Sequence, residues 1–239
     1  MAILSVNVNH IGTLRKAGSF GYPDPVAGSV LAELAGADGI VVHLTEDRRH
    51  IQDRDLNMLR SIIQTKLVLK MASTSEMVGI ALNLQPDVVT LVPERREEFT
   101  SKGGLDLIVH KNDAAETVET LQNSGIHVSV FIDPDPDQIK IAHQINADIV
   151  EIHTKTFCES KTSKSRKQAF SNILDAVKLA HKIKIGVNAG SGLCYNTIKS
   201  FKGLHEIEEF SIGHSIISRA VLVGMERAVK EMKALIKDL

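Results

Sequence analysis

The sequence predicts a (β/α)8 barrel, and three observations support that prediction. The chain has 239 residues, close to the length of about 250 that is typical of this fold. Short β-branched runs alternate with amphipathic stretches eight times along it. Four of the runs also have one consistently apolar face and one that becomes polar. An open doubly wound sheet is the alternative, but it would usually have fewer strands and often a G-x-G-x-x-G first turn, which residues 10–18 lack.

The expected strands are short runs rich in valine and isoleucine, whose branched side chains pack well on a pleated surface. They cover residues 3–9, 39–44, 67–72, 87–92, 126–133, 149–153, 185–189 and 209–213. The expected helices repeat apolar residues at helical spacing. They cover residues 25–36, 54–64, 75–84, 113–124, 135–146, 166–182, 195–201 and 215–237. Because no Ser- or Pro-rich linker and no low-complexity segment interrupts this alternation, we expect one domain over residues 1–239.

Alternation within the strands predicts which face meets the helices. In the run 39–44, Ile40, Val42 and Leu44 share one face, whereas Val41 and His43 share the other. The same separation occurs in the runs 3–9, 67–72 and 149–153. A barrel strand has one face under the helices and the other in the interior. The polar side chains lie toward the carboxyl end of each strand, where barrel enzymes place their chemistry.

Composition argues against several classes of function. Lys and Arg number 28 against 29 Asp and Glu, a formal net charge of -1 that disfavours a nucleic-acid partner bound by bulk charge. Aromatic residues make up 4% with no Trp, which is unfavourable for base stacking. Cys158 and Cys194 are too few for a disulfide framework or a four-thiolate zinc site. Neither a membrane span nor a signal peptide is recognisable, so we expect a cytoplasmic protein without membrane partners.

Two connections are long and charged. Residues 93–112 follow the fourth expected strand, and residues 154–165 follow the sixth. Long loops in compact domains often act as lids, and a basic lid would attract anionic substrates. A solvated surface loop explains both segments equally well.

The glycines after the last two expected strands indicate an anion site. Gly190-Ser191-Gly192 follows the seventh strand, and Gly213-His214 ends the eighth and begins the last helix. Glycines let backbone amides approach a phosphate, and a helix N-terminus adds partial positive charge. His214 could donate a hydrogen bond to the same phosphate. The alternative is that these glycines only form tight turns.

His43 is the candidate proton shuttle, because it ends the second expected strand and imidazole titrates near neutrality. Arg48 or Arg49, just after it, could hold a second anionic group through two hydrogen bonds. Glu151 and His153 add a carboxylate and another imidazole on an interior face. A strand-end histidine can equally be a satisfied hydrogen-bond partner, and a charge run such as EDRRH often begins a solvated helix.

Lys70 is unusual, because the alternation of side chains puts it on the interior face of a strand otherwise made of Leu, Val and Met. A lysine removed from water can react with a ketone to form a Schiff base. The favoured alternative is that Lys70 pairs with Glu151 or extends toward the barrel mouth. A metal site is weakly supported, because the first strand offers Asn7 and Asn9-His10 rather than a His-x-His pair.

Several motifs resemble those of the pyridoxine 5′-phosphate synthase family of vitamin B6 biosynthesis. They span nearly the whole chain in order, and EDRRHI-x-DRD at 46–55 is highly specific. The other matches are N-x-N-H-I-x-T-L-R at 7–15, YPDP at 22–25, GADGI at 36–40, LVPE at 91–94, GGLD at 103–106, EIHT at 151–154, VNAG-x-GL at 187–193 and IGH-x-II-x-RA at 212–220.

The resemblance implies a (β/α)8 barrel that assembles as a homo-octamer and needs no metal or organic cofactor. The implied reaction condenses 3-amino-2-oxopropyl phosphate with 1-deoxy-D-xylulose 5-phosphate and releases inorganic phosphate and water. The implied partners are therefore small phosphorylated substrates. By position, His43 would be a general acid/base. The resemblance places Asn7, Asn9, His10, Arg48, Thr100 and Glu151 in the substrate pocket and Gly192, Gly213 and His214 at a phosphate.

This chain departs from the family pattern at positions that the resemblance assigns to the site. Lys70 stands in place of a catalytic glutamate and Ser191 in place of a catalytic histidine. Asn9 replaces an aspartate, and Gly18 and Thr45 replace arginines. Three hypotheses follow: the family's synthase reaction, a divergent enzyme that uses Lys70 on another phosphorylated carbonyl compound, or a phosphometabolite-binding protein without catalysis.

Overall fold

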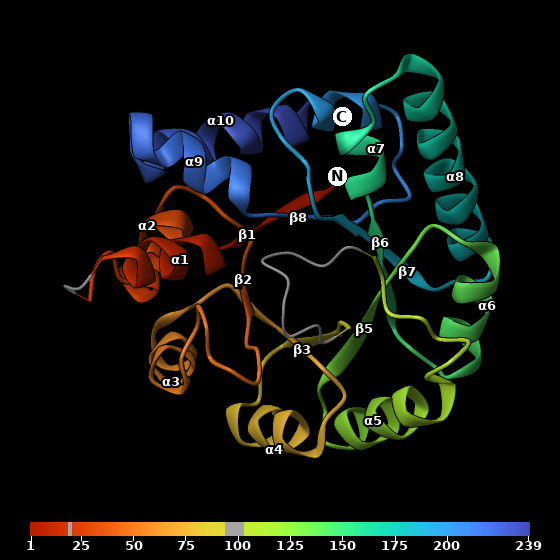
Figure 1. Ribbon diagram of the computed structural model, residues 1–239, viewed down its shortest axis with the longest axis horizontal. Coiled ribbons are helices and arrows are strands. Elements are labelled where there is room, and N and C mark those ends of the chain that lie inside the picture. The colour runs from red at the N-terminus through yellow and green to blue at the C-terminus, as the bar shows by residue number, and fades with distance from the viewer. Residues whose placement is uncertain (19–20, 94–102) are drawn as a thin grey trace.

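The strands form a closed parallel barrel, as the sequence predicts. The structure, a computed structural model, describes residues 1–18, 21–93 and 103–239. Each strand pairs with the next, and β8 pairs with β1 (Figure 1). The strands are β1 (Ile3–Asn7), β2 (Gly39–His43), β3 (Lys66–Met71), β4 (Val88–Leu91), β5 (His127–Ile132), β6 (Ile149–His153), β7 (Gly186–Gly190) and β8 (Glu209–Ile212).

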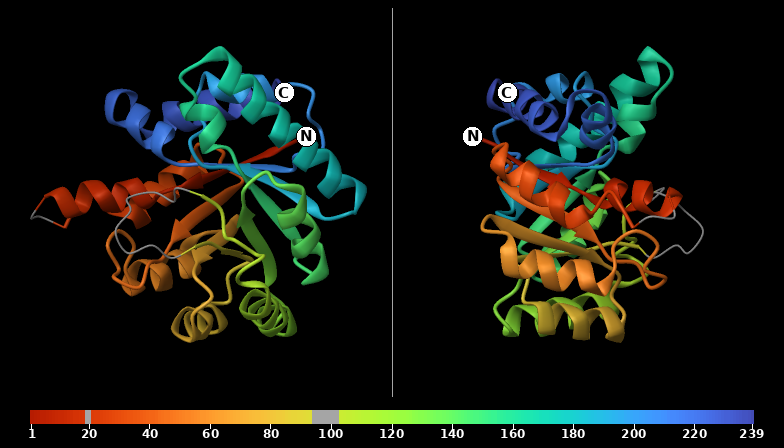
Figure 2. Two further views of the ribbon diagram at one scale, coloured as in Figure 1. Left: turned by 45° about the vertical axis from the view of Figure 1, so that its right-hand side comes forward. Right: turned by 90° about the vertical axis from the view of Figure 1, so that its left-hand side faces the viewer.

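The helices surround the barrel on its outside (Figures 1 and 2). They are α1 (Asn9–Ala17), α2 (Pro25–Leu34), α3 (Asp53–Ile62), α4 (Ser75–Leu84), α5 (Lys111–Asn123), α6 (Pro136–Gln144), α7 (Lys155–Glu159), α8 (Ser163–Lys182), α9 (His214–Val223) and α10 (Met225–Lys237), with a 3-10 helix η1 (Thr197–Phe201). Among the described residues, no helix is long and apolar enough to cross a membrane.

Local sequence explains where several helices begin. Asp24 and Asp135 cap α2 and α6 by accepting hydrogen bonds from backbone amides of the first turn, and a proline follows each of them. Proline suits the first helical position because its missing N–H would have no partner there. Thr162 accepts from the amide of Ser165 and begins α8 in the same way. These caps fix where α2, α6 and α8 begin.

The two faces of the strands contact different cores. Outward residues such as Ile40, Leu67 and Leu69 belong to one large cluster that includes the buried faces of the helices. The inward Val41, Val68 and Val88 form a separate small cluster. The interior also contains polar side chains, so the alternation read from the sequence is confirmed.

Three helix predictions were wrong. Residues 9–17 form α1, which sequence patterning missed because Gly12, Asn9 and several polar residues weaken its helical signal. Helix α7 and the start of α8 occupy the predicted loop 154–165. The predicted helix 215–237 is two helices, because Gly224 has a positive φ of 84° and ends α9. Of the loop 93–112, residues 94–102 lie outside the described residues.

Candidate active site

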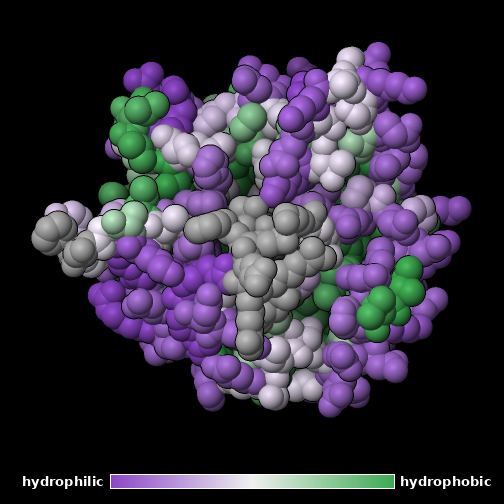
Figure 3. Space-filling model, viewed as in Figure 1, coloured by the Kyte–Doolittle hydropathy of each residue, from purple (hydrophilic) through white to green (hydrophobic). Residues whose placement is uncertain are grey.

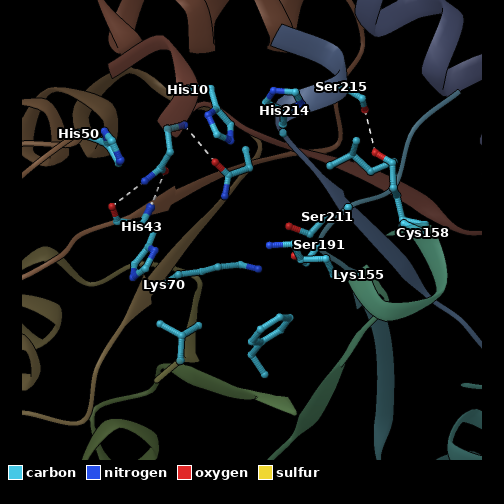
Figure 4. Close-up of a pocket in the computed structure, with 18 of the residues that line it drawn as sticks. His10, His43, His50, Lys70, Lys155, Cys158, Ser191, Ser211, His214 and Ser215 are labelled. Carbon is cyan, nitrogen blue, oxygen red and sulfur yellow. Dashed lines mark hydrogen bonds between the residues drawn. The ribbon is translucent and has the colours of Figure 1, made fainter. Parts of the chain in front are cut away.

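A cavity of about 480 Å³ opens at the carboxyl ends of the strands. That volume is within the usual range for small-molecule sites, about 300–1,000 Å³. Most of the candidate residues line it, as Figure 4 shows for those it labels. Those that line it are Asn7, Asn9, His10, His43, Lys70, Ser191, Gly192, Gly213 and His214. Thr100 lies outside the described residues.

Lys70 forms an ion pair with Glu151 inside the barrel. Its Nζ lies 2.5 Å from Glu151 Oε1, and the two side chains are 11% and 3% exposed. The same Nζ lies 5.2 Å from the centre of the Phe131 ring. Glu151 has room beside β7 because a Cβ at Gly190 would lie 2.1 Å from its Oε1. The expected contact between Lys70 and Glu151 is therefore confirmed, and Glu151 lies behind Lys70 rather than on the cavity wall.

Asn9 holds the backbone of His43. Its Oδ1 accepts from the His43 amide at 2.7 Å, and its Nδ2 donates to the His43 carbonyl at 2.8 Å. Burial lowers the pKa of His43 to about 4, and the positive charges of Lys70 and then His50 act in the same direction. A neutral imidazole can accept a proton at one ring nitrogen and donate from the other. At neutral pH, His43 is thus a fixed, uncharged group beside Lys70.

His10 lies at the start of α1 on the opposite side of the cavity mouth from Lys70 (Figure 4). Its ring meets that of His214 edge to face, with centroids 5.0 Å apart. The pKa of His10 is lowered to about 4, mainly by burial. The neighbouring His214 and His50 lower this pKa by smaller amounts. His10 is therefore also neutral at neutral pH.

These two histidines predict a loss of stability in mild acid. Their folded-state pKa values of about 4 lie below the ordinary value of 6.5, so the unfolded chain takes up more protons between these limits. Unfolding is then favoured as the pH falls from about 6.5 toward 4. We expect a lower midpoint in urea unfolding at pH 5 than at pH 7, and a smaller difference in His10→Asn. Equal midpoints at both pH values would contradict this.

The glycine loops after β7 and β8 are joined to one another. Ser215 Oγ donates to the carbonyl of Leu193 at 2.8 Å (Figure 4), and Thr154 Oγ1 donates to that of Ser191 at 2.6 Å. Ser191 and Gly192 have positive φ values of 72° and 81°. A Cβ at Gly213 would lie 2.9 Å from the Asn7 carbonyl oxygen. The result is a compact rim at the N-terminus of α9, which suits an anion.

Arg48 and Arg49 point to different places. Arg48 has a positive φ of 50°, and its guanidinium pairs with Asp53 at 3.2 Å and Glu76 at 2.6 Å. It does not line the cavity, whereas Arg49 does. The sequence offered either arginine as an anion ligand and the family resemblance placed Arg48 in the pocket, whereas the structure places Arg49 on its wall.

Other residues of the cavity wall were missed. His50, Phe131, Lys155 and Ser211 all line it. Phe131 and Ser211 follow the interior parity of β5 and β8, which could have identified them. Lys155 could not be placed, because α7 occupies a segment that the sequence predicted as a loop.

His153 lies away from this cavity. Its Nδ1 is 2.7 Å from Asp133 Oδ1, and its ring meets that of Phe131. It lines a second cavity of about 280 Å³ that α8 also borders. In the described part of the chain, no group of three or more His, Cys, Asp or Glu residues could hold a metal ion.

The fold and this cavity define a (β/α)8-barrel protein with an enzyme-like site at the carboxyl ends of its strands. The chain belongs to the family described as pyridoxal phosphate biosynthesis protein PdxJ, whose model matches residues 4–238. This confirms the family resemblance read from the motifs.

Curated relatives match the chain from end to end. It is 58% identical over 239 residues to a pyridoxine 5′-phosphate synthase of Desulforapulum autotrophicum, covering 100% of both chains. It is 56% identical over 239 residues to one of Desulfatibacillum aliphaticivorans, again covering 100% of both. A third, from a Geobacter species, is 55% identical over 237 residues and 99% of each chain.

Solved structures support the fold alone. KGPDC from Streptococcus mutans has a TM-score of 0.63 at 16% identity, covering 99% of this chain and 98% of that one. Phosphoribosylanthranilate isomerase from Thermotoga maritima has a TM-score of 0.62 at 12% identity, covering 100% of both.

Proposed function

We propose that this protein is a pyridoxine 5′-phosphate synthase that condenses 3-amino-2-oxopropyl phosphate with 1-deoxy-D-xylulose 5-phosphate. The observation that carries the proposal is the end-to-end match, at 58% identity, to a relative of that name. The cavity at the carboxyl ends of the strands supports it, because it combines polar groups for proton transfer with an anion-binding rim.

The two phosphates would occupy different parts of the cavity. One would accept hydrogen bonds from the rim formed by Gly192, Gly213 and His214, where the N-terminus of α9 contributes partial positive charge. The other would lie against Arg49, whose side chain is 12% exposed, and Lys155. Arg48 would act indirectly, because its bonds to Asp53 and Glu76 hold the turn that carries Arg49.

Proton transfer would fall to His43. The amine of one substrate adds to the ketone of the other, and water leaves as the imine forms. His43, neutral and held by Asn9, can take the proton from the attacking nitrogen and return one to the leaving hydroxyl. Asn9 is then a positioning residue, and Asn7 and His10 would contact the substrates from the wall formed by β1 and α1.

Formation of pyridoxine 5′-phosphate from the two substrates tests this function. We expect product from the unaltered protein. A double variant, Lys70→Glu with Ser191→His, restores the two residues that the family resemblance assigns to catalysis. Product from the double variant combined with none from the unaltered protein would contradict the proposal and favour a protein that binds phosphometabolites or acts on another substrate.

We also propose that the chain assembles as a homo-octamer, by its resemblance to the family. Val221 and Leu222 near the end of α9 are 67% and 80% exposed, and Figure 3 shows an apolar patch there. Exposed apolar patches of this kind mark contact surfaces. Light scattering in solution would give the mass of the assembly.

A further inference from the structure

Lys70 lies on the floor of the cavity and crosses the barrel. In the register of the parallel strands β2 and β3, Lys70 lies beside His43. Figure 4 shows its side chain extending toward Ser191 and Ser211 on the far wall. The closed strand order places β3 opposite β7. The amine therefore ends between the anion-binding rim and the neutral imidazole of His43.

The surroundings of the Lys70 amine suit proton exchange. Glu151 Oε1 lies 2.5 Å from Nζ, and the Phe131 ring forms an apolar wall at 5.2 Å. A carboxylate at this distance can accept the proton that the Lys70 nitrogen gives up as it attacks a carbonyl carbon. A neutral amine that is largely removed from water and borders a substrate cavity is a nucleophile for carbonyl groups.

Lys66 shows that the ion pair alone does not create this arrangement. It shares the strand and the inward face of Lys70 and pairs with the buried Glu209. Glu209 also accepts from Asn188 Nδ2 at 3.3 Å. Lys66 lies at the other end of β3 and does not line the cavity. Lys66 is therefore an internal control, a lysine with the same type of partner but without access to a substrate.

We propose that the Lys70 amine forms a covalent iminium with the ketone of a phosphorylated ketose whose phosphate binds the rim of Gly192, Gly213 and His214. The choice of ketose, 1-deoxy-D-xylulose 5-phosphate, rests on the proposed function. The assignment of Lys70 rests on its own contacts.

The Lys70 ammonium gives one proton to Glu151, and the amine nitrogen bonds to the carbonyl carbon as the C=O π bond breaks. The proton then lost by nitrogen moves to the new alkoxide, a transfer that His43 is placed to carry. Glu151 returns its proton to the hydroxyl, which leaves as water while nitrogen and carbon form the iminium double bond. The sum is ammonium plus ketone giving iminium plus water.

The iminium would activate the ketone for the second substrate. The amino group of 3-amino-2-oxopropyl phosphate adds to the same carbon, and the Lys70 amine leaves. The product is the imine between the two substrates, and Lys70 is regenerated. The lysine thus supplies a covalent route to the bond that the condensation must form.

Reductive trapping tests the proposal with a single substrate. The full-length protein is incubated with 1-deoxy-D-xylulose 5-phosphate and sodium cyanoborohydride, and the intact mass and peptide map are measured. We expect close to one adduct per chain, with a mass gain equal to the ketose phosphate less one oxygen atom, on Lys70. The unphosphorylated ketose should label far less, because it cannot bind the rim.

Variants separate Lys70 from its neighbours. Lys70→Arg keeps a cation for Glu151 and should lose the adduct, whereas Lys66→Arg should keep it. The peptide map of the unaltered protein decides the matter even if a variant fails to fold.

Two outcomes would overturn the proposal. One is the absence of any adduct at saturating ketose phosphate, and the other is an adduct on Lys155 or Lys66 instead of Lys70. An adduct on Lys70 in a protein that forms no pyridoxine 5′-phosphate would support the iminium and contradict the proposed function. Formation of pyridoxine 5′-phosphate without an adduct would support the proposed function and contradict the iminium.

Discussion

Replacing His43 with alanine is expected to lower kcat for pyridoxine 5′-phosphate formation by about 10²–10⁴, the usual contribution of a general acid/base. The imidazole is neutral, because burial and the charge of Lys70 hold its pKa at about 4. His43 lines the cavity and lies in register with Lys70 on the neighbouring strand. Steady-state kinetics with both substrates measures the effect.

His205→Ala is the matched control for this variant. His205 is exposed and lies in the segment before β8, at the opposite end of the barrel from the cavity. It should leave kcat unchanged. A His43→Ala protein that keeps its fold and its full kcat would show that proton transfer does not depend on this imidazole. A rise in KM at constant kcat would instead assign His43 to binding.

Asp55→Ala is expected to lower the free energy of unfolding by about 3–5 kcal/mol, the range for removing one partner of a buried ion pair. Asp55 is fully buried, and its carboxylate accepts from Arg15 at 2.9 and 2.6 Å. It also accepts from the Gln52 amide at 3.0 Å, at the start of α3. Arg15 in turn donates to the His50 carbonyl at 2.8 Å. One carboxylate thus ties α1, α3 and the turn after β2 together.

Arg54→Ala provides the comparison, because Arg54 is the neighbour of Asp55 but is 56% exposed. Its contact with Asp24 at 3.3 Å is at the surface, where such pairs contribute about 0–1 kcal/mol, and it reaches the buried Asp55 carboxylate only at 3.4 Å. Urea unfolding of both variants measures the difference. A loss in Asp55→Ala no larger than that in Arg54→Ala would mean that the buried pair does not hold these helices.

Much of the candidate site followed from strand parity. His43, Lys70 and Asn7 were assigned to the interior because strand side chains alternate between two faces, and all three line the cavity. The same rule placed Glu151 and Lys70 close enough to pair. Gly213 and His214 could be placed because their motif ends a strand and begins a helix.

Parity failed where the chain left the strands. Arg48 and Arg49 are adjacent, yet Arg48, with its positive φ, pairs with Asp53 and Glu76, and Arg49 lines the cavity. Asn9 looked like a substrate ligand, but it begins α1, and both of its amide atoms bond to the backbone of His43 at the end of β2. Lys155 reaches the cavity wall from a short helix that has almost no sequence signal.

The sequence by itself determined the barrel, the order of its strands and the face on which each strand residue lies, because these depend on local periodicity and on a fixed connection pattern. The tertiary structure alone decided charge contacts that lie outside the strands. It placed Asp55 2.6 Å from Arg15, 40 residues away in the chain, and it held two histidines neutral by burying them. Ion pairing and desolvation depend on distances between distant segments, which no local pattern specifies.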